Sequence, residues 1–333
     1  MSTVSTTEGK SLSGSGAGLR SRFGSRRGLP GLPPPAAAPS TGGSLARSRR
    51  RAGLLMVAPA LLHALIWIGI PLVAAVVLSF TSYDVLTPPR FTGLQNFRDL
   101  FSDNVFRRAV LNTSIYTFFT VPVAMGIALL IALMLNTKLA GRAIFRTAIF
   151  IPQVTATIAV ALVWLWIYDP RSGLANAVLS FLGLDGPAWL SSTDWAMPAV
   201  IVVGIWQGIG LKMLIYLAAL QSLPVDLYEA ASVDGASKVR QFFSLTLPLL
   251  RPATFFVFVT SVIGAFQSFD QVYILTDGGP ANSTTMMTYE IYKSAFREFR
   301  MGYACAQSLV LFALLLFLTL LNRRITGGDR ATR

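Results

Sequence analysis

Long apolar segments separated by short polar ones run along most of the chain. Six of them reach or exceed the length of about 20 residues that a helix needs to cross a bilayer core of about 30 Å. They cover residues 53–80, 109–136, 147–168, 196–220, 253–275 and 303–322. Because helices that are apolar on every side are typical of membrane spans, the pattern predicts an all-α integral membrane protein with six transmembrane helices.

Polar segments mark off the parts of the chain outside these helices. Residues 1–51 are rich in Ser, Gly, Pro and Arg and contain few large apolar side chains. Such a segment buries too little surface to offset the entropy lost on ordering, so it is predicted to be a disordered, basic tail. Residues 52–325 then form one transmembrane domain with a polar loop at 221–252, and residues 326–333 form a second short tail.

The composition agrees with a membrane protein and its charges give an orientation. Of the residues, 53% are apolar and 13% are charged, and the net charge is +13. Segments 1–52, 137–146, 219–252 and 322–333 hold 19 of the 28 Lys and Arg residues against 5 acidic ones, whereas the other three loops hold 8 basic and 9 acidic residues. Since excess Lys and Arg marks the cytoplasmic side, the distribution predicts that both termini are cytoplasmic.

This uneven distribution also accounts for the positive charge without a nucleic-acid partner. The first apolar segment is directly preceded by four arginines, Arg47, Arg49, Arg50 and Arg51. Basic residues at that position are attracted to the anionic headgroups of membrane lipids. The expected partner of these side chains is therefore membrane lipid.

Catalytic and cofactor chemistry has little support in the sequence. Cys305 is the single cysteine, which excludes an internal disulfide. The single histidine, His63, lies in an apolar segment, which argues against a metal centre. Gly9-Lys10-Ser11 resembles the end of a phosphate-binding loop, but Val4 stands where that motif has its first glycine. We expect the chain to be no enzyme and to bind neither a metal nor a cofactor of its own.

The loop at 221–252 carries signals for two short helices. Pro224 suits the first turn of a helix, and Asp226 and Glu229 then lie near the positive end of its dipole. Gly235 stands where a left-handed turn ends the helix, and Ser237 can cap a second one. A solvated loop with helical turns and a docking surface for a cytoplasmic partner both fit this pattern. The docking surface better explains why a capped helix pair is presented there.

Polar residues in apolar segments are candidates for a solute pathway because hydrocarbon disfavours them. Ser261, Gly264, Gln267, Ser268 and Gln271 of the fifth segment share about a third of the circumference of a continuous helix. That face is predicted to turn inward, either toward solute or toward hydrogen bonds with neighbouring helices.

Helix rise places further candidates at defined depths. Gln207 and Gln267 both lie roughly 20 Å from the cytoplasmic ends of their segments, so they can face one cavity, with Trp206 stacking on a sugar ring or packing between helices. Lys212 and Asp270 differ in depth by roughly 14 Å, which argues against a direct ion pair. Lys212 is expected to face the cavity or to reach toward the cytoplasmic surface. The predicted pathway residues are Trp206, Gln207, Lys212, Ser261, Gln267, Ser268, Asp270 and Gln271.

Several motifs together resemble the permease subunits of binding-protein-dependent ABC importers. "EAASVDGAS" followed by "LTLP" is similar to the cytoplasmic signature loop of that family, in which Leu245 stands where isoleucine is common. "FTGLQNF", "LQSLPVDLYEAA", "FDQVYILTDGGPANSTT" and "GYACAQS" are similar to its carbohydrate branch, the maltose-type or glycerol-3-phosphate-type permeases. The resemblance covers about residues 53–325.

The resemblance implies a type I importer permease fold in the bacterial cytoplasmic membrane. It implies that the loop contacts a separate ATP-binding subunit, through Glu229, Ala230, Ala231, Asp234, Gly235, Ala236, Leu247 and Pro248. Two such subunits would hold ATP and Mg²⁺, a second permease would complete the pathway, and an extracytoplasmic binding protein would deliver a sugar or sugar-like solute.

Two other classes of protein stay open on the residues alone: a self-sufficient secondary transporter or channel, and a membrane enzyme. The first lacks an evident acid–base relay and the second lacks clustered His, Asp or Glu.

Overall fold

The computed structural model describes residues 42–137 and 141–326 of the chain, which divides into two units, 1–61 and 62–333. The first 41 residues of the predicted disordered tail, and most of the predicted C-terminal tail, lie outside the described residues. The prediction was wrong for residues 42–51, which belong to helix α1 (Gly42–Ala64). Four of these ten residues are Arg, which favours helices, and the stretch leads into the apolar segment without a break.

Helices make up most of the described part of the second unit. After the π-helical turn Leu65–Gly69 and α2 (Ile70–Ser79) come strands β1 (Thr81–Ser82) and β2 (Arg90–Phe91), an antiparallel pair in which Thr81 lies opposite Phe91. The next helices are α3 (Gln95–Ser102), α4 (Asn104–Leu135), α5 (Arg142–Val154), α6 (Thr157–Ile167), α7 (Leu174–Phe181), α8 (Ala196–Gln221) and α9 (Val225–Val233). Then follow α10 (Lys238–Gln241), the π-helical turn Phe242–Thr246, α11 (Leu247–Leu249), α12 (Arg251–Phe266), α13 (Asp270–Leu275), α14 (Met287–Tyr292), the π-helical turn Lys293–Arg297 and α15 (Met301–Thr326).

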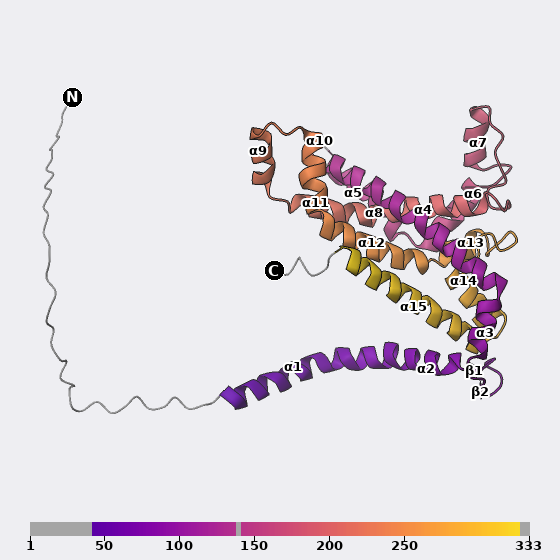
Figure 1. Ribbon diagram of the computed structural model, residues 1–333. Coiled ribbons are helices and arrows are strands. Elements are labelled where there is room, and N and C mark those ends of the chain that lie inside the picture. The colour runs from indigo at the N-terminus through magenta and orange to yellow at the C-terminus, as the bar shows by residue number, and fades with distance from the viewer. Residues whose placement is uncertain (1–41, 138–140, 327–333) are drawn as a thin grey trace, which may run out of the picture. The chain divides into compact units, whose positions relative to one another are not determined.

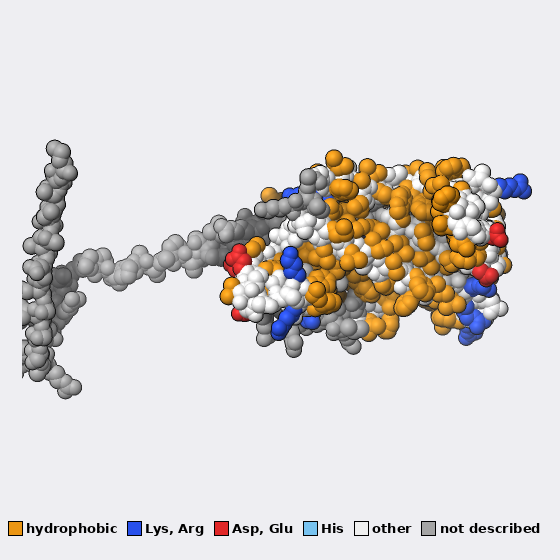
Figure 2. Space-filling view, turned by 90° about the horizontal axis from the view of Figure 1, so that it is seen from above, with side chains coloured by type: hydrophobic (Ala, Val, Ile, Leu, Met, Phe, Trp, Pro, Cys, Tyr) orange, Lys and Arg blue, Asp and Glu red, His pale blue; other side chains and the backbone are white. Residues whose placement is uncertain are grey.

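By length and composition, four helical stretches can cross a membrane: Gly53–Ser79, Asn104–Leu135, Ala196–Gln221 and Met301–Leu321. Two bent pairs, α5 with α6 and α10–α11 with α12, raise the number to six if each pair is one span. Figure 2 shows apolar side chains covering the middle of one face, with the Lys, Arg, Asp and Glu side chains gathered at its two ends. An apolar band between charged ends is the surface that a bilayer requires.

The third and fifth apolar segments are not the continuous helices that the sequence predicts. The 147–168 segment bends by 97° between α5 and α6. Pro152 supplies no backbone N–H there, and the Thr155 hydroxyl donates to the Ile151 carbonyl at the end of α5. In the 253–275 segment, α12 ends at Phe266, and the Ser268 carbonyl accepts a hydrogen bond from the Thr288 hydroxyl. Tertiary hydrogen bonding therefore replaces helical continuity at this break.

The centre of the bundle is built on α4 and α8, which lie against each other (Figure 1). Ala124, Ala128 and Ala132, spaced four residues apart on α4, are fully buried. Small residues at this spacing let helix backbones approach closely. On α8, a side chain at Gly204 would collide with the Tyr116 hydroxyl, and one at Gly210 would lie 2.7 Å from the Ile149 carbonyl of α5. These small residues therefore set how closely α4, α5 and α8 approach one another.

The loop between α13 and α14 is fastened to α4. The Asn112 side-chain amide donates to the Asn282 and Thr285 carbonyls, both at 2.9 Å. Within the same part of the chain, the Asp277 carboxylate accepts two hydrogen bonds of 2.9 Å from the Arg297 guanidinium, and the Tyr289 hydroxyl also donates to it. Hydrogen bonds from Arg297 hold the pKa of Asp277 below its ordinary value of 3.8.

Replacing Asp277 by Asn is expected to lower the melting temperature by a few degrees at most, since the pair is exposed to solvent. Because the carboxyl pKa is lower in the folded chain, its contribution is present above about pH 4 and is lost as the pH falls further. The difference in melting temperature between wild type and Asp277→Asn should therefore shrink below pH 4. Thermal unfolding in detergent from pH 3 to 7 measures it. Asp194→Asn, at an exposed carboxylate outside the described ion pairs, is the control, and a difference unchanged down to pH 3 would contradict the prediction.

Candidate functional site

The polar loop after α8 folds as two short helices joined by a left-handed turn, as its sequence predicts. Gly235 follows α9 with a φ of +75°, and nothing lies within 4 Å of where its side chain would be. The Ala236 N–H donates to the Ala231 carbonyl at 2.9 Å, which closes the end of α9. The Ser237 hydroxyl caps α10 by accepting from the Arg240 N–H at 3.3 Å. Pro224 differs from the prediction, since it precedes α9 in an extended conformation rather than lying in its first turn.

Side-chain hydrogen bonds hold the two short helices together. The Gln241 amide donates to the Ser232 hydroxyl at 3.0 Å and to the Ala236 carbonyl at 3.1 Å. The Tyr228 and Thr246 hydroxyls are 3.0 Å apart. These contacts link α9 to α10 and to the π-helical turn that leads into α12. The loop is therefore an ordered structure, and Figure 1 places α9 and α10 at the end of the bundle opposite to α3 and α7.

Apolar side chains are exposed on this helix pair and on the π-helical turn that follows it. These exposed side chains are Val225, Leu227, Val233, Val239 and Phe243. Among the predicted contact residues, Glu229, Ala230, Asp234 and Gly235 are exposed, Ala231 and Ala236 are partly buried, and Leu247 and Pro248 lie in α11. Exposed apolar patches rimmed by polar residues are typical of protein interfaces.

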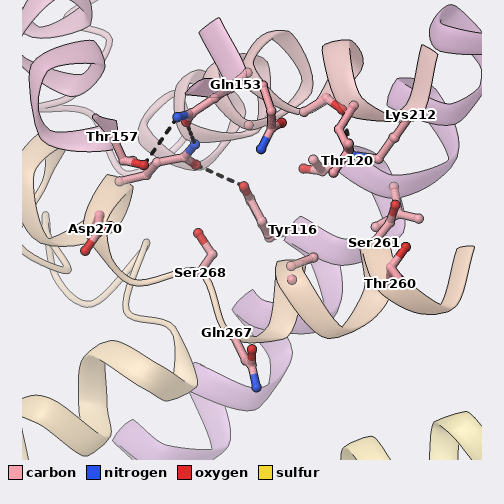
Figure 3. Close-up of a pocket in the computed structure, with 18 of the residues that line it drawn as sticks. Tyr116, Thr120, Gln153, Thr157, Lys212, Thr260, Ser261, Gln267, Ser268 and Asp270 are labelled. Carbon is pink, nitrogen blue, oxygen red and sulfur yellow. Dashed lines mark hydrogen bonds between the residues drawn. The ribbon is translucent and has the colours of Figure 1, made fainter. Parts of the chain in front are cut away.

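A cavity of about 350 Å³ lies inside the bundle, between α4, α8, α12 and the two helix breaks (Figure 3). Its size falls within the range of small-molecule sites. Most of the lining side chains are polar although the surrounding helices are apolar. The polar ones are Tyr116, Thr120, Gln153, Thr157, Gln207, Lys212, Thr260, Ser261, Gln267, Ser268, Asp270 and Gln271.

A chain of hydrogen bonds crosses this cavity from helix to helix. The Tyr116 hydroxyl donates to the Gln271 Oε1 at 3.0 Å, and the Gln271 Nε2 donates to the Gln207 Oε1 at 2.7 Å. The Gln207 Nε2 then donates to the Thr157 Oγ1 at 3.3 Å. Four elements, α4, α13, α8 and α6, are thereby joined through side chains of which three are buried. In apolar surroundings such a network fixes one arrangement of the helices.

Lys212 lies at the cavity wall on the side away from Asp270 in Figure 3. Its ammonium donates to the Gly208 carbonyl, one turn earlier in α8, at 2.9 Å. None of the ion pairs among the described residues joins Lys212 to Asp270, as the predicted difference in depth implies. Lys212 therefore faces the cavity, one of the two positions expected for it.

Seven of the eight predicted pathway residues line this cavity, and Trp206 does not. Of the two roles expected for Trp206, the structure shows packing between helices, since its ring lies edge-on against Trp164 at 5.6 Å between ring centres. The prediction that the residues of the fifth segment share one face of a continuous helix was wrong. Ser261 lies in α12, Gln267 and Ser268 lie in the break, and Asp270 and Gln271 lie in α13, so the break rather than helical periodicity brings them together.

The sequence analysis missed the contribution of α4 and of the α5–α6 break. Tyr116, Thr120, Gln153 and Thr157 all line the cavity. Gln153 carried a usable signal, since it is an amide in an apolar segment. Over residues 42–137 and 141–326, no three His, Cys, Asp or Glu side chains gather in a way that could hold a metal ion.

Comparisons with known proteins agree with this geometry. Residues 100–327 match the model of the family described as "Binding-protein-dependent transport system inner membrane component". The chain is 38% identical over 280 residues to the "Probable ABC transporter permease protein YesP" of Bacillus subtilis, covering 83% of this chain and 90% of that protein. It is 35% identical over 278 residues to the sulfoquinovosyl glycerol transport system permease protein SmoG of Agrobacterium fabrum, covering 83% and 90%.

A solved structure shares the fold. A crystal structure of the bacterial alginate ABC transporter in complex with an alginate pentasaccharide-bound periplasmic protein contains a chain that matches with a TM-score of 0.72 and 26% identity. The match covers 85% of this chain and 98% of that one. A polar cavity inside an apolar helix bundle, an ordered helix pair at one end and these matches lead to one conclusion. The chain belongs to the family of binding-protein-dependent transport system inner membrane components and is a permease of an ABC importer.

Proposed function

We propose that the chain forms half of the translocation pathway for a sugar or sugar-like solute, and that the solute passes through the cavity between α4, α8 and α12. The observation that carries this proposal is the cavity itself, which is lined by amides, hydroxyls, one ammonium and one carboxylate inside an otherwise apolar bundle. Such groups match the hydroxyls of a carbohydrate. The names of SmoG and of the alginate transporter, both carriers of sugar compounds, support the solute class.

The proposed assembly contains a second permease, two ATP-binding subunits and an extracytoplasmic binding protein. The periplasmic protein in the alginate transporter supports the last of these. ATP and Mg²⁺ are held by the ATP-binding subunits, and this chain binds no cofactor. The chain lies in the bacterial cytoplasmic membrane with six spans, the two bent helix pairs included, and with both termini in the cytoplasm.

The helix pair α9–α10 is the proposed contact with an ATP-binding subunit. Its exposed apolar side chains and the exposed Glu229 carboxylate provide an apolar patch with a charge beside it. An apolar centre with a polar rim is the usual anatomy of a protein interface. Coupling residues proposed for this contact are Glu229, Ala230, Ala231, Asp234, Gly235, Ala236, Leu247 and Pro248.

Reconstitution tests the proposed function. A tagged chain should retain an ATP-binding subunit, a second permease and a binding protein through mild purification. Proteoliposomes that hold this assembly should take up the solute of the binding protein only when ATP is supplied, and omitting the ATP-binding subunits should reduce uptake by at least 100-fold. Uptake by the purified chain alone, driven by an ion gradient, would instead establish a secondary transporter.

A further inference from the structure

We propose that the cavity accepts solutes that carry an anionic group, such as a carboxylate, sulfonate or phosphate on a sugar, and that Lys212 binds this group. The inference rests on the proposed transport function and narrows its substrate class. It is carried by the position of one ammonium, by the space that a neighbouring glycine provides for it, and by a buried hydroxyl in the same cavity.

The Lys212 ammonium has donor capacity beyond its contact within α8. An ammonium carries three N–H protons, and the described side-chain hydrogen bonds use one of them, to the Gly208 carbonyl. None of the ion pairs found in the described parts of the chain involves Lys212. Lys212 lines the cavity, so its ammonium can use the remaining donors toward a solute there.

Gly208 makes room for the ammonium at that place. A side-chain carbon at position 208 would lie 2.7 Å from the Lys212 Nζ, closer than non-bonded atoms approach. Gly208 also lines the cavity. With a glycine there, the Lys212 side chain lies back along α8 and its ammonium is held at cavity depth by the Gly208 carbonyl.

A buried hydroxyl of α4 offers a second donor. Thr113 and Thr117 each donate to the carbonyl four residues earlier, at 2.7 Å. Thr120 continues this side of α4 and is 6% exposed, but its hydroxyl has no partner among the described residues. It lines the same cavity as Lys212, and so does Ser261 (Figure 3). An ammonium together with hydroxyl donors is a matching set for an oxyanion, which has several lone pairs to share.

The charge favours an anionic group over a neutral sugar hydroxyl. A hydroxyl can accept a hydrogen bond from Lys212 but brings no opposite charge, and none of the ion pairs among the described residues gives Lys212 a direct one. A carboxylate or phosphate supplies both the acceptor atoms and the opposite charge. Asp270, which lines the cavity on another side, repels the same group and so favours its binding next to Lys212.

Chemical modification of lysines in the assembled importer tests this inference. The chain has lysines at 10, 138, 212, 238 and 293, so their modification by a small amine-reactive reagent can be followed at each site by mass spectrometry. The probes are D-galacturonate, glucose 6-phosphate and neutral D-galactose, at ionic strength matched with sodium chloride. We expect at least one of the anionic probes to slow modification of Lys212 three-fold or more, while Lys238 and Lys293 stay unchanged and D-galactose has little effect. Which of the two anions protects distinguishes a carboxylate site from a phosphate site.

Two threonines of α4 provide matched variants. Thr120→Val should raise the concentration of the protecting anion that is needed for half protection by three-fold or more. Thr117→Val, whose hydroxyl is bonded within α4 and which does not line the cavity, should leave it unchanged. Equal protection by galactose, or no protection by either anion, would overturn the inference. If the proposed transport function itself failed, ATP-dependent uptake would be missing whatever protected Lys212, so the two failures can be told apart.

Discussion

Gly235→Val is expected to reduce ATP-driven uptake by roughly ten-fold while the protein still inserts and assembles in the membrane. Gly235 has a φ of +75°, a conformation that costs residues with a side chain about 1–2 kcal/mol and β-branched ones more. No atoms lie within 4 Å of the position of the added Cβ, so the main cost is one of backbone conformation. The turn would relax toward negative φ, and α9 would be reoriented relative to α10. Uptake into proteoliposomes and ATP hydrolysis should both be measured, since we expect hydrolysis to lose its dependence on the binding protein.

Gly183→Val is the matched control for this substitution. Gly183 has a φ of +74°, also has nothing within 4 Å of its missing side chain, and follows α7 in the same way that Gly235 follows α9. Helix α7, which it follows, lies at the other end of the bundle, away from the α9–α10 pair (Figure 1). Uptake by Gly183→Val should stay within two-fold of wild type. Equal losses in the two variants would show that strain in general, and not the coupling turn, is responsible.

Gln271→Leu is expected to destabilise the bundle and to abolish most uptake. Gln271 both accepts from Tyr116 and donates to Gln207, so its replacement leaves two buried polar groups without their partner. Each buried group left unsatisfied costs about 1–3 kcal/mol. A loss on the order of 2–5 kcal/mol would lower the melting temperature in detergent by several degrees. Tryptophan fluorescence or a thiol-reactive dye on Cys305 can follow this unfolding.

Gln267→Leu separates this network from the lining of the cavity. Gln267 also lines the cavity and sits in the same break, but its side chain is exposed and makes no hydrogen bond among the described residues. We expect its melting temperature to stay within about 1 °C of wild type, although uptake can change. If Gln267→Leu were as unstable as Gln271→Leu, the break itself, and not the hydrogen-bond chain, would hold the helices.

Local signals in the sequence were sufficient for the helix pair that follows α8. A glycine for the left-handed turn and a serine for the cap act within four residues of their own position, so their outcome can be read without knowing the rest of the fold. The apolar segments likewise predicted an all-α membrane protein, whereas the permease fold was implied by the resemblance of the motifs. The lengths of the apolar segments reflect only the thickness of hydrocarbon.

Tertiary contacts decided what the sequence could not show. The break after Phe266 depends on Thr288, twenty residues beyond Ser268, and no helical periodicity contains that partner. Trp206 and Gln207 are adjacent and looked equally suited to a sugar site, but α8 turns one toward Trp164 and the other toward Gln271. Which face of an apolar helix meets which neighbour is a property of the packed bundle.

Helix α8 runs as one continuous helix from the cavity to the three-residue link that precedes α9. It carries Gln207 and Lys212 at the cavity and ends at Gln221, three residues before α9 begins to form. The stretch from Lys212 to Gln221 is roughly 14 Å long at the rise of an α-helix. If this stretch tilts as a stiff rod by about 10°, one end moves by roughly 2–3 Å relative to the other. A displacement of that size equals the reach of a hydrogen bond, so in the proposed assembly a small swing at the α9 end of the helix is enough to make or break a contact between the cavity and a solute.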